Sequence, residues 1–137
     1  MTIKELSIFV QNKKGKLAAI SRLMGENEIN IRAFNMQDTA EGYGIFRLIV
    51  DYTEKAREIL QANHFTVSET EVAALALPDK PNALYNLLNL FAENGLNVEY
   101  IYAGANSVVM IKLDDPNKAG QILQKEGLPL INNTLKI

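Results

Sequence analysis

The segment at residues 20–31, ISRLMGENEINI, decides the fold, because a related segment, LLNLFAENGLNV, stands 67 positions later at residues 87–98. The identical positions are Leu23, Glu26, Asn27 and Asn30, which recur as Leu90, Glu93, Asn94 and Asn97. A second pair of segments, DYTEKAREILQ at 51–61 and DDPNKAGQILQ at 114–124, matches at an offset of 63. Two matching blocks in the same order indicate a duplicated unit, with a shorter loop between the blocks in the second copy.

The hydrophobic pattern of each copy predicts the order strand, helix, strand, strand, helix, strand. Apolar residues alternate at 3–10, as in a strand with one buried face, and then follow a helical stripe. This order is that of the ferredoxin-like βαββαβ unit. We therefore expect an α+β protein of two such units, 1–69 and 70–137, packed side by side, each with an antiparallel sheet and both helices on one face.

Several residues mark the expected helix ends. Pro81 suits the first turn of a helix, and Gly95 suits the left-handed residue that ends it. Glu28 stands at the position of Gly95 in the first copy, where left-handed geometry costs about 1 kcal/mol. We expect Asp51 and Asp114 to cap the second helix of each copy.

The alternation also predicts a largely apolar sheet face on the side without helices. Its expected members are Phe9, Phe34, Met36, Ile45 and Ile49, and, in the second copy, Ala74, Ala76, Ile101, Val108 and Met110. A monomer rarely leaves such a surface in water, so we expect a homodimer in which the sheet of a second chain covers this face. An error of one residue in the strand register would place these side chains on the other face instead.

Composition excludes several kinds of partner and cofactor. The net charge is −2 and the pI about 5.4, so no basic field attracts nucleic acid or an anionic membrane. Cysteine is absent and histidine occurs once, which argues against disulfides, thiolate catalysis and metal sites built on these residues. We expect no cofactor and no metal. The N-terminal sequence does not resemble a secretion signal and no run reaches membrane length, so a cytoplasmic location is expected.

Catalysis is not expected either. A nucleophilic serine would need His64 as its base, and His64 sits at a predicted helix end with no obvious acid to orient it. No glycine-rich phosphate loop appears. We therefore predict that the protein is not an enzyme.

The loops that open the two copies are the strongest candidates for a site. They are NKKGKL at 12–17 and DKPNAL at 79–84, and each leads from a strand into a helix. The free amides at a helix N-terminus favour a carboxylate, and Asn12 or Asp79 is able to accept a hydrogen bond from an ammonium group. A free amino acid carries both groups. The other interpretation is that these residues only turn the chain and cap the helix.

The longer segments NKKGKLAAISRLMGENEINI and DKPNALYNLLNLFAENGLNV resemble the ACT domain, with its Asp-x-Pro-Gly-x-Leu opening and its Asn-Ile strand entry. Lys14 stands where the family favours proline, and Asn82 where it favours glycine, so the two loops are not expected to be equivalent. The whole chain resembles a stand-alone pair of ACT units without a catalytic domain.

The resemblance implies regulatory binding of a free amino acid at the interface between units, near the first strand–helix loops. The candidate ligand-binding residues are Asn12, Gly15, Lys16, Leu17, Asn30, Ile31, Asp79, Asn82, Ala83, Leu84, Asn97, Val98 and Tyr100. Tyr100 and Tyr102 either line a pocket or belong to the core and the sheet face. The alternative function is that of a non-catalytic regulatory subunit that partners an enzyme of amino-acid metabolism.

Overall fold

The computed structural model describes residues 2–128, 130–132 and 137. It divides into two compact units: Lys4–Thr70, called the first unit below, and Glu71–Ile137 with the start of the chain, called the second unit.

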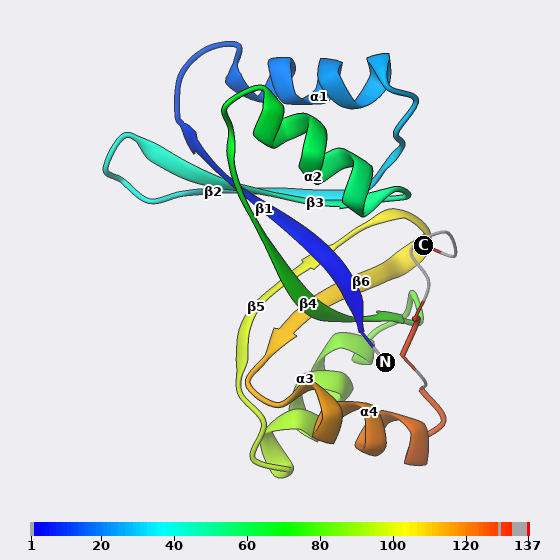
Figure 1. Ribbon diagram of the computed structural model, residues 1–137. Coiled ribbons are helices and arrows are strands. Elements are labelled where there is room, and N and C mark those ends of the chain that lie inside the picture. Colours follow the sequence, from blue (N-terminus) through cyan, green and yellow to red (C-terminus); the bar gives the residue numbers. More distant parts are fainter. Residues whose placement is uncertain (1, 129, 133–136) are drawn as a thin grey trace. The chain divides into compact units, whose positions relative to one another are not determined.

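The first unit is an antiparallel sheet with two helices. Its elements are β1 (Ile3–Gln11), α1 (Lys16–Glu26), β2 (Ile31–Asp38), β3 (Tyr43–Val50), α2 (Thr53–Ala62) and the first half of β4 (Thr66–Ala76). The strand order is β2-β3-β1-β4, and β3 pairs antiparallel with both β2 and β1. Both helices cover the same face of these strands (Figure 1). This is the predicted ferredoxin-like arrangement.

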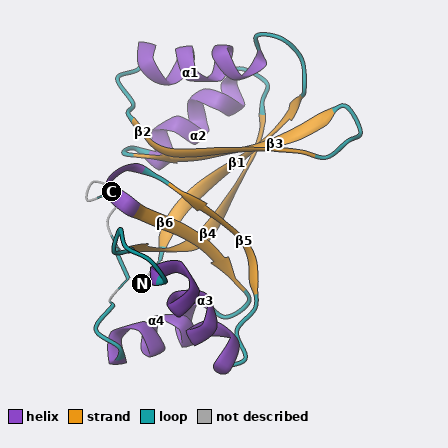
Figure 2. Cartoon of the chain, turned by 180° about the vertical axis from the view of Figure 1, so that it is seen from behind, coloured by secondary structure: helices purple, strands orange, loops and turns teal. Residues whose placement is uncertain are grey.

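The second unit repeats this plan. Its elements are the second half of β4, α3 (Ala83–Glu93), β5 (Val98–Ala103), a short 3-10 helix η1 (Ala105–Ser107), β6 (Val108–Leu113) and α4 (Pro116–Lys125). The strand order is β4-β6-β5, again with both helices on one face (Figure 2). The Ile131 amide donates a hydrogen bond to the Ala74 carbonyl oxygen at 2.6 Å, beside β4. The predicted closing strand that begins near Leu128 lies largely outside the described residues.

Strand registers confirm that the two units are copies. Phe34 pairs with Leu48 in the first unit, and Ile101 pairs with Ile111 in the second, at the same offsets of 67 and 63 seen in the sequence. Each copy has a core made from one face of its sheet and its two helices. The fully buried members with the largest side chains include Leu6, Ile8, Ile20, Met24, Leu48, Leu75, Leu87, Phe91 and Ile111. Burying each such side chain contributes about 1.5–3 kcal/mol.

The predicted left-handed helix ends are confirmed. Gly95 has φ 71° and Glu28 has φ 57°, so the glutamate adopts the conformation that glycine adopts in the other copy. In both places the next residue returns its amide to the helix, from Ile29 to Met24 and from Leu96 to Phe91, at 2.9 Å.

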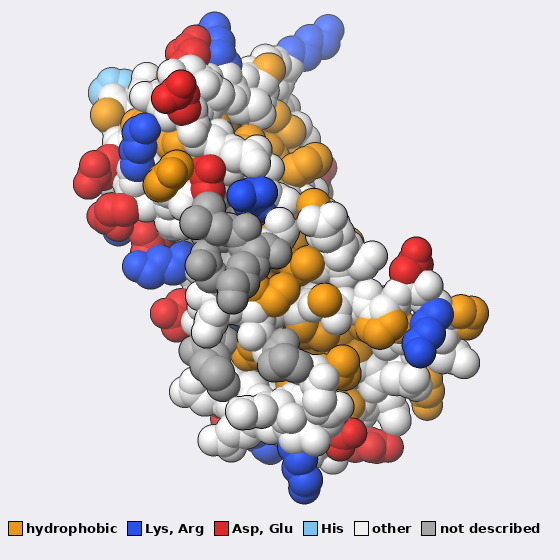
Figure 3. Space-filling view, turned by 90° about the vertical axis from the view of Figure 1, so that its right-hand side faces the viewer, with side chains coloured by type: hydrophobic (Ala, Val, Ile, Leu, Met, Phe, Trp, Pro, Cys, Tyr) orange, Lys and Arg blue, Asp and Glu red, His pale blue; other side chains and the backbone are white. Residues whose placement is uncertain are grey.

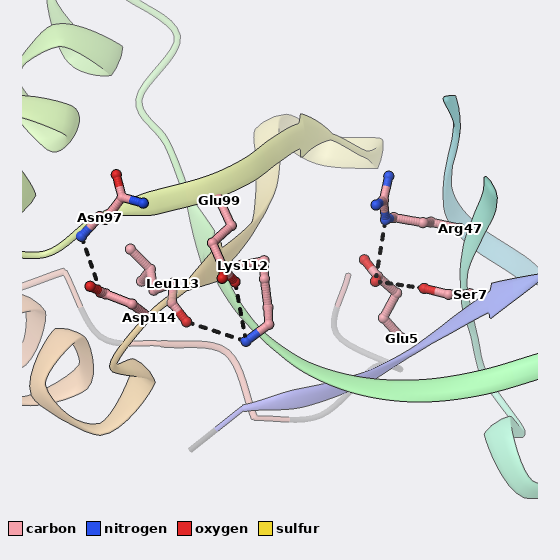
Figure 4. A network of polar contacts seen from close by, with 8 residues as sticks. All are labelled: Glu5, Ser7, Arg47, Asn97, Glu99, Lys112, Leu113 and Asp114. Atoms are coloured by element: carbon pink, nitrogen blue, oxygen red, sulfur yellow. Dashed lines mark hydrogen bonds and ion pairs between the residues drawn. The ribbon is translucent and has the colours of Figure 1, made fainter. Parts of the chain in front are cut away.

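The prediction that Asp51 and Asp114 cap the second helices is wrong. Each carboxylate instead accepts a hydrogen bond at 3.0 Å from a backbone amide at the start of the neighbouring strand, that of Asn30 or Asn97 (Figure 4 shows the second pair). The cap of α4 is Asp115, one residue later. The aspartates therefore tie two strands together.

Two of the residues predicted for the helix-free face of the first unit lie on the other face. Phe34 and Met36 pair with core residues of β3, and cross-strand partners point to the same face, so both face α1. The cause is a bulge between Ile31 and Ala33, which inserts one residue and reverses the alternation beyond it. The alternative of a one-residue register error is correct here.

The same bulge occurs in the second unit, between Val98 and Tyr100, and turns Ile101 toward the helices. Tyr100 and Tyr102 therefore lie on the helix-free face, where their rings stack with centroids 6.4 Å apart. The other predicted members keep the expected face: Phe9, Ile45, Ile49, Ala74, Ala76, Val108 and Met110.

Candidate functional site

Backbone contacts fix the position of the loop from β1 into α1. The Asn12 amide donates to the Gly42 carbonyl oxygen at 2.9 Å, which fastens the loop to the β2–β3 hairpin. Gly15 precedes the helix with φ 84°. A Cβ atom at this position would meet no atom within 4 Å, so the space beside the loop is free. Glycine is favoured here because the backbone is left-handed.

The first turn of α1 has no side-chain cap. The Lys16 amide makes a long contact of 3.3 Å with the Lys13 carbonyl oxygen. The amides of Leu17 and Ala18 come too early in the helix for an intrahelical acceptor. This end of α1 therefore offers hydrogen-bond donors and the positive end of the helix dipole.

Asp38 brings a carboxylate to Asn12, in the loop that leads into α1. The Asn12 side-chain amide donates to its Oδ1 at 3.4 Å, and the Ala40 amide donates to the same oxygen at 3.3 Å. Sequence reasoning missed Asp38, since the two residues are 26 positions apart and no local pattern joins them. In the second copy its position, counted at the offset of 67, is occupied by Ala105.

A groove of about 580 Å³ lies between α1 and β2, and we call it the α1–β2 groove. It is lined by Leu17, Ala18, Ser21, Ile31, Phe34, Asn35, Met36 and Phe46. Met36 reaches the groove wall because its partner strand has glycine nearby: a Cβ on Gly44 would collide with the Met36 side chain. Leu17 and Ile31 are sequence-predicted site residues that the fold brings together here.

Other predicted residues of the first unit have different surroundings. The Asn30 amide is occupied by Asp51. Lys16 lines a separate hollow of about 270 Å³, together with residues that include Gln11 and His64.

The second loop has the same backbone with different side chains. Asn82 precedes α3 with φ 68°, so asparagine does adopt the left-handed conformation of Gly15, and it makes no side-chain cap. Ala83 lines a small cavity of about 220 Å³, Asp79 lines another of about 190 Å³, and the Leu84 side chain is exposed.

The remaining predicted residues of the second unit belong to its strands. The Asn97 amide is held by Asp114, and Val98 packs against the core. Tyr100 lies on the sheet face opposite α3 and α4, because it pairs with Lys112, whose neighbours on β6 face the core.

The most buried charged pair is part of the first unit's sheet. Arg47 Nε lies 3.8 Å from Glu5 Oε1, and the Ser7 hydroxyl donates to Glu5 at 3.4 Å (Figure 4). Arg47 Nη1 also donates to the Gln37 side-chain oxygen at 2.8 Å. Partners occupy these groups, as expected of a structural ion pair.

Charge elsewhere is mixed. On the face drawn in Figure 3, acidic and basic side chains are interspersed, so no extended basic surface lies there. In the part of the chain that the structure describes, no group of three or more acidic or histidine side chains is arranged to hold a metal. Nor does any described helix combine the length and apolarity needed to cross a membrane.

Comparison with known families decides the classification. The family described as "ACT domain pair" matches residues 1–136. The chain belongs to this family. The expectation of two ACT units over nearly the whole chain is therefore confirmed, and an ACT pair is a type of regulatory module.

Solved structures agree with an ACT pair. A crystal structure of a protein from Bacteroides thetaiotaomicron is 34% identical, with a TM-score of 0.89 over 96% of this chain and 92% of that one. The regulatory subunit of aspartate kinase from Thermus thermophilus, in its ligand-free form, is 13% identical, with a TM-score of 0.66 over 89% and 90% of the two chains. The corresponding subunit from Thermus flavus is 14% identical, with a TM-score of 0.66 over 88% of each chain. At such identities these two subunits share the fold alone. Among curated proteins, no sequence matches.

Proposed function

We propose that this ACT pair is a non-catalytic regulatory protein of the cytoplasm that binds a free amino acid beside the first strand–helix loop. The observation that carries the proposal is the contact between Asn12 and Asp38 at the uncapped start of α1. It brings a carboxylate and a carboxamide together at the loop that leads into the uncapped helix.

The two charged groups of an amino acid match this arrangement. The ligand carboxylate accepts from the amides of Leu17 and Ala18, where the helix dipole favours a negative charge. The ligand ammonium donates to Asp38 and to the carboxamide oxygen of Asn12, in charge-assisted hydrogen bonds. Gly15 leaves the approach clear of side-chain atoms.

Thermal unfolding against the twenty amino acids at millimolar concentration tests the proposal. A ligand at a hundred times its Kd adds about 2.7 kcal/mol to the stability of the folded state. For a chain of 137 residues the unfolding entropy is about 0.29 kcal/mol/K, so the midpoint should rise by about 9 °C.

Asp38→Asn and Asn12→Ala should abolish that rise while changing the unfolding midpoint of the free protein little, since both side chains are exposed. Asp79→Ala in the second loop is the matched control. No shift with any amino acid would contradict amino-acid binding.

A second candidate is a regulatory subunit that joins an enzyme of amino-acid metabolism. It is favoured by the shared fold with the regulatory subunits of aspartate kinase. Under this candidate the tagged protein co-purifies with an enzyme from its own cells without added ligand. A free sensor elutes without a stoichiometric partner.

A further inference from the structure

We infer that the ligand site of this chain is built in the first unit alone and takes an amino acid with a large apolar side chain. The inference rests on the proposed function and adds the class of ligand and the number of sites. Two observations support it: the α1–β2 groove of the first unit, and the different residues that stand at the positions of its wall in the second copy.

The groove suits an apolar side chain. Its volume of about 580 Å³ falls within the range of about 300–1,000 Å³ found for small-molecule sites. Its walls are mostly aliphatic and aromatic, and the Ser21 hydroxyl already donates to the Leu17 carbonyl oxygen at 3.0 Å. A polar ligand side chain would find few partners there, and burying it without a hydrogen bond is unfavourable.

The groove and the Asp38 carboxylate lie on the same face of β2. Met36 lines the groove, and Asp38 follows it by two residues on β2, paired with Gly44 on the same side of the sheet. An ammonium group held by Asp38 therefore directs the ligand side chain along Met36 toward Phe34. The Asp38 carboxylate complements the ammonium group of the ligand, and the N-terminus of α1 complements its carboxylate. The α1–β2 groove takes the ligand side chain.

Both parts of this site are lost in the second unit. Tyr85 and Leu88 stand at the positions of Ala18 and Ser21, so two small residues of the groove wall become large ones. The hairpin of the second unit is shorter, so β5 ends at Ala103, and Ala105, at the offset of 67 from Asp38, lies in η1 and carries no carboxylate. We therefore expect one ligand per chain.

Isothermal titration of the purified full-length chain tests the class of ligand. The series is glycine, alanine, leucine, methionine and phenylalanine, with asparagine and glutamine as polar counterparts of leucine and methionine. Each buried methylene changes the affinity about fourfold, so leucine should bind roughly fifty-fold more tightly than alanine. Asparagine and glutamine should bind more weakly than leucine and methionine, and the stoichiometry should be one.

Exchanging the wall residues of the groove between the two copies tests where the ligand binds. Ala18→Tyr with Ser21→Leu gives the first unit the walls of the second, at positions that are exposed and tolerate larger side chains. This double variant should lose the preference for leucine over alanine. The reverse exchange, Tyr85→Ala with Leu88→Ser, is the matched control and should keep both the affinity and the stoichiometry of one.

Phe34→Ser gives a second test if the exchanged protein does not fold. Phe34 is 67% exposed, so its replacement should not disturb the core. It should weaken phenylalanine and leucine binding about tenfold or more and leave alanine binding unchanged.

Several results would overturn the inference. They are equal binding of polar and apolar amino acids, two ligands per chain, or a wall-exchanged first unit that binds leucine as the wild type does. Tight binding of a polar amino acid would refute this inference and leave the proposed function standing. Absence of binding by every amino acid would refute both.

Discussion

At the scale of the residue, the two copies place different side chains at positions that have the same left-handed backbone conformation. Gly15 and Asn82 both adopt the left-handed conformation before a helix, and Glu28 and Gly95 both adopt it after one. An L side chain in this conformation costs about 1–2 kcal/mol relative to glycine. The first copy therefore carries strain at its helix end that the second copy avoids.

Exchanging these residues should move stability in opposite directions. Glu28→Gly should raise the free energy of unfolding by about 0.5–1 kcal/mol, because the relief of strain exceeds the added freedom of the unfolded chain. Gly95→Ala should lower it by about 1 kcal/mol. Urea denaturation measures both, and a loss of stability in Glu28→Gly would contradict the argument.

At the scale of the element, Asp51 and Asp114 hold adjacent strands in register. Each carboxylate stands just after one strand and accepts a hydrogen bond from the amide that immediately precedes the neighbouring strand, β2 or β5. The bulge follows directly after that contact. The contact and the bulge recur in both copies. Together they turn the outer part of β2 so that Phe34 and Met36 face α1.

Removing the carboxylate should release this tie. Asp51→Ala should cost about 1–2 kcal/mol, since the Asn30 amide loses a charged acceptor. Asp51→Asn keeps an oxygen at the same place and should cost less. Hydrogen exchange of the Asn30 amide checks the local effect, and equal protection in the alanine variant and the wild type would refute the assigned role.

At the scale of the whole molecule, much of the helix-free face is already buried within a single chain, where Ile49, Ala74, Val108 and Met110 are at most 3% exposed, so the expectation that a second chain covers the whole face is wrong. The bulge removes Phe34, Met36 and Ile101 from it. An aromatic pair remains at one end of the first unit, where the rings of Phe9 and Tyr43 stack at 5.1 Å and are 49% and 40% exposed. We propose that the protein forms a homodimer through this part of the face.

A charged side chain in place of Phe9 should dissociate the dimer. Phe9→Glu should shift the sedimentation coefficient of the purified protein to that of a monomer, because a carboxylate is unfavourable in an apolar interface. Lys13→Gln, in the exposed loop nearby, changes the net charge by the same −1 and is the control. A wild-type protein that sediments as a monomer would refute the proposed dimer.

The sequence by itself determined the features that local patterns encode. Repetition established the duplication, the alternation and helical stripes established the order of elements, and Gly95 marked a helix end. The prediction that Pro81 lies in the first turn of a helix is wrong, because α3 begins two residues later, at Ala83, after the left-handed Asn82. The sequence also located both strand–helix loops. These properties depend on neighbours a few residues away, so a linear pattern carries them.

The tertiary structure alone decided which side chains meet. Asp38 lies beside Asn12 because the β2–β3 hairpin folds against the loop, and Phe34 borders a groove because a bulge forms where β2 pairs with β3. Contacts with other segments set both features, and the sequence of β2 alone does not show where the extra residue of a bulge interrupts the period of two. A one-residue shift reverses every side chain beyond it, which is why the candidate groove emerged only with the fold.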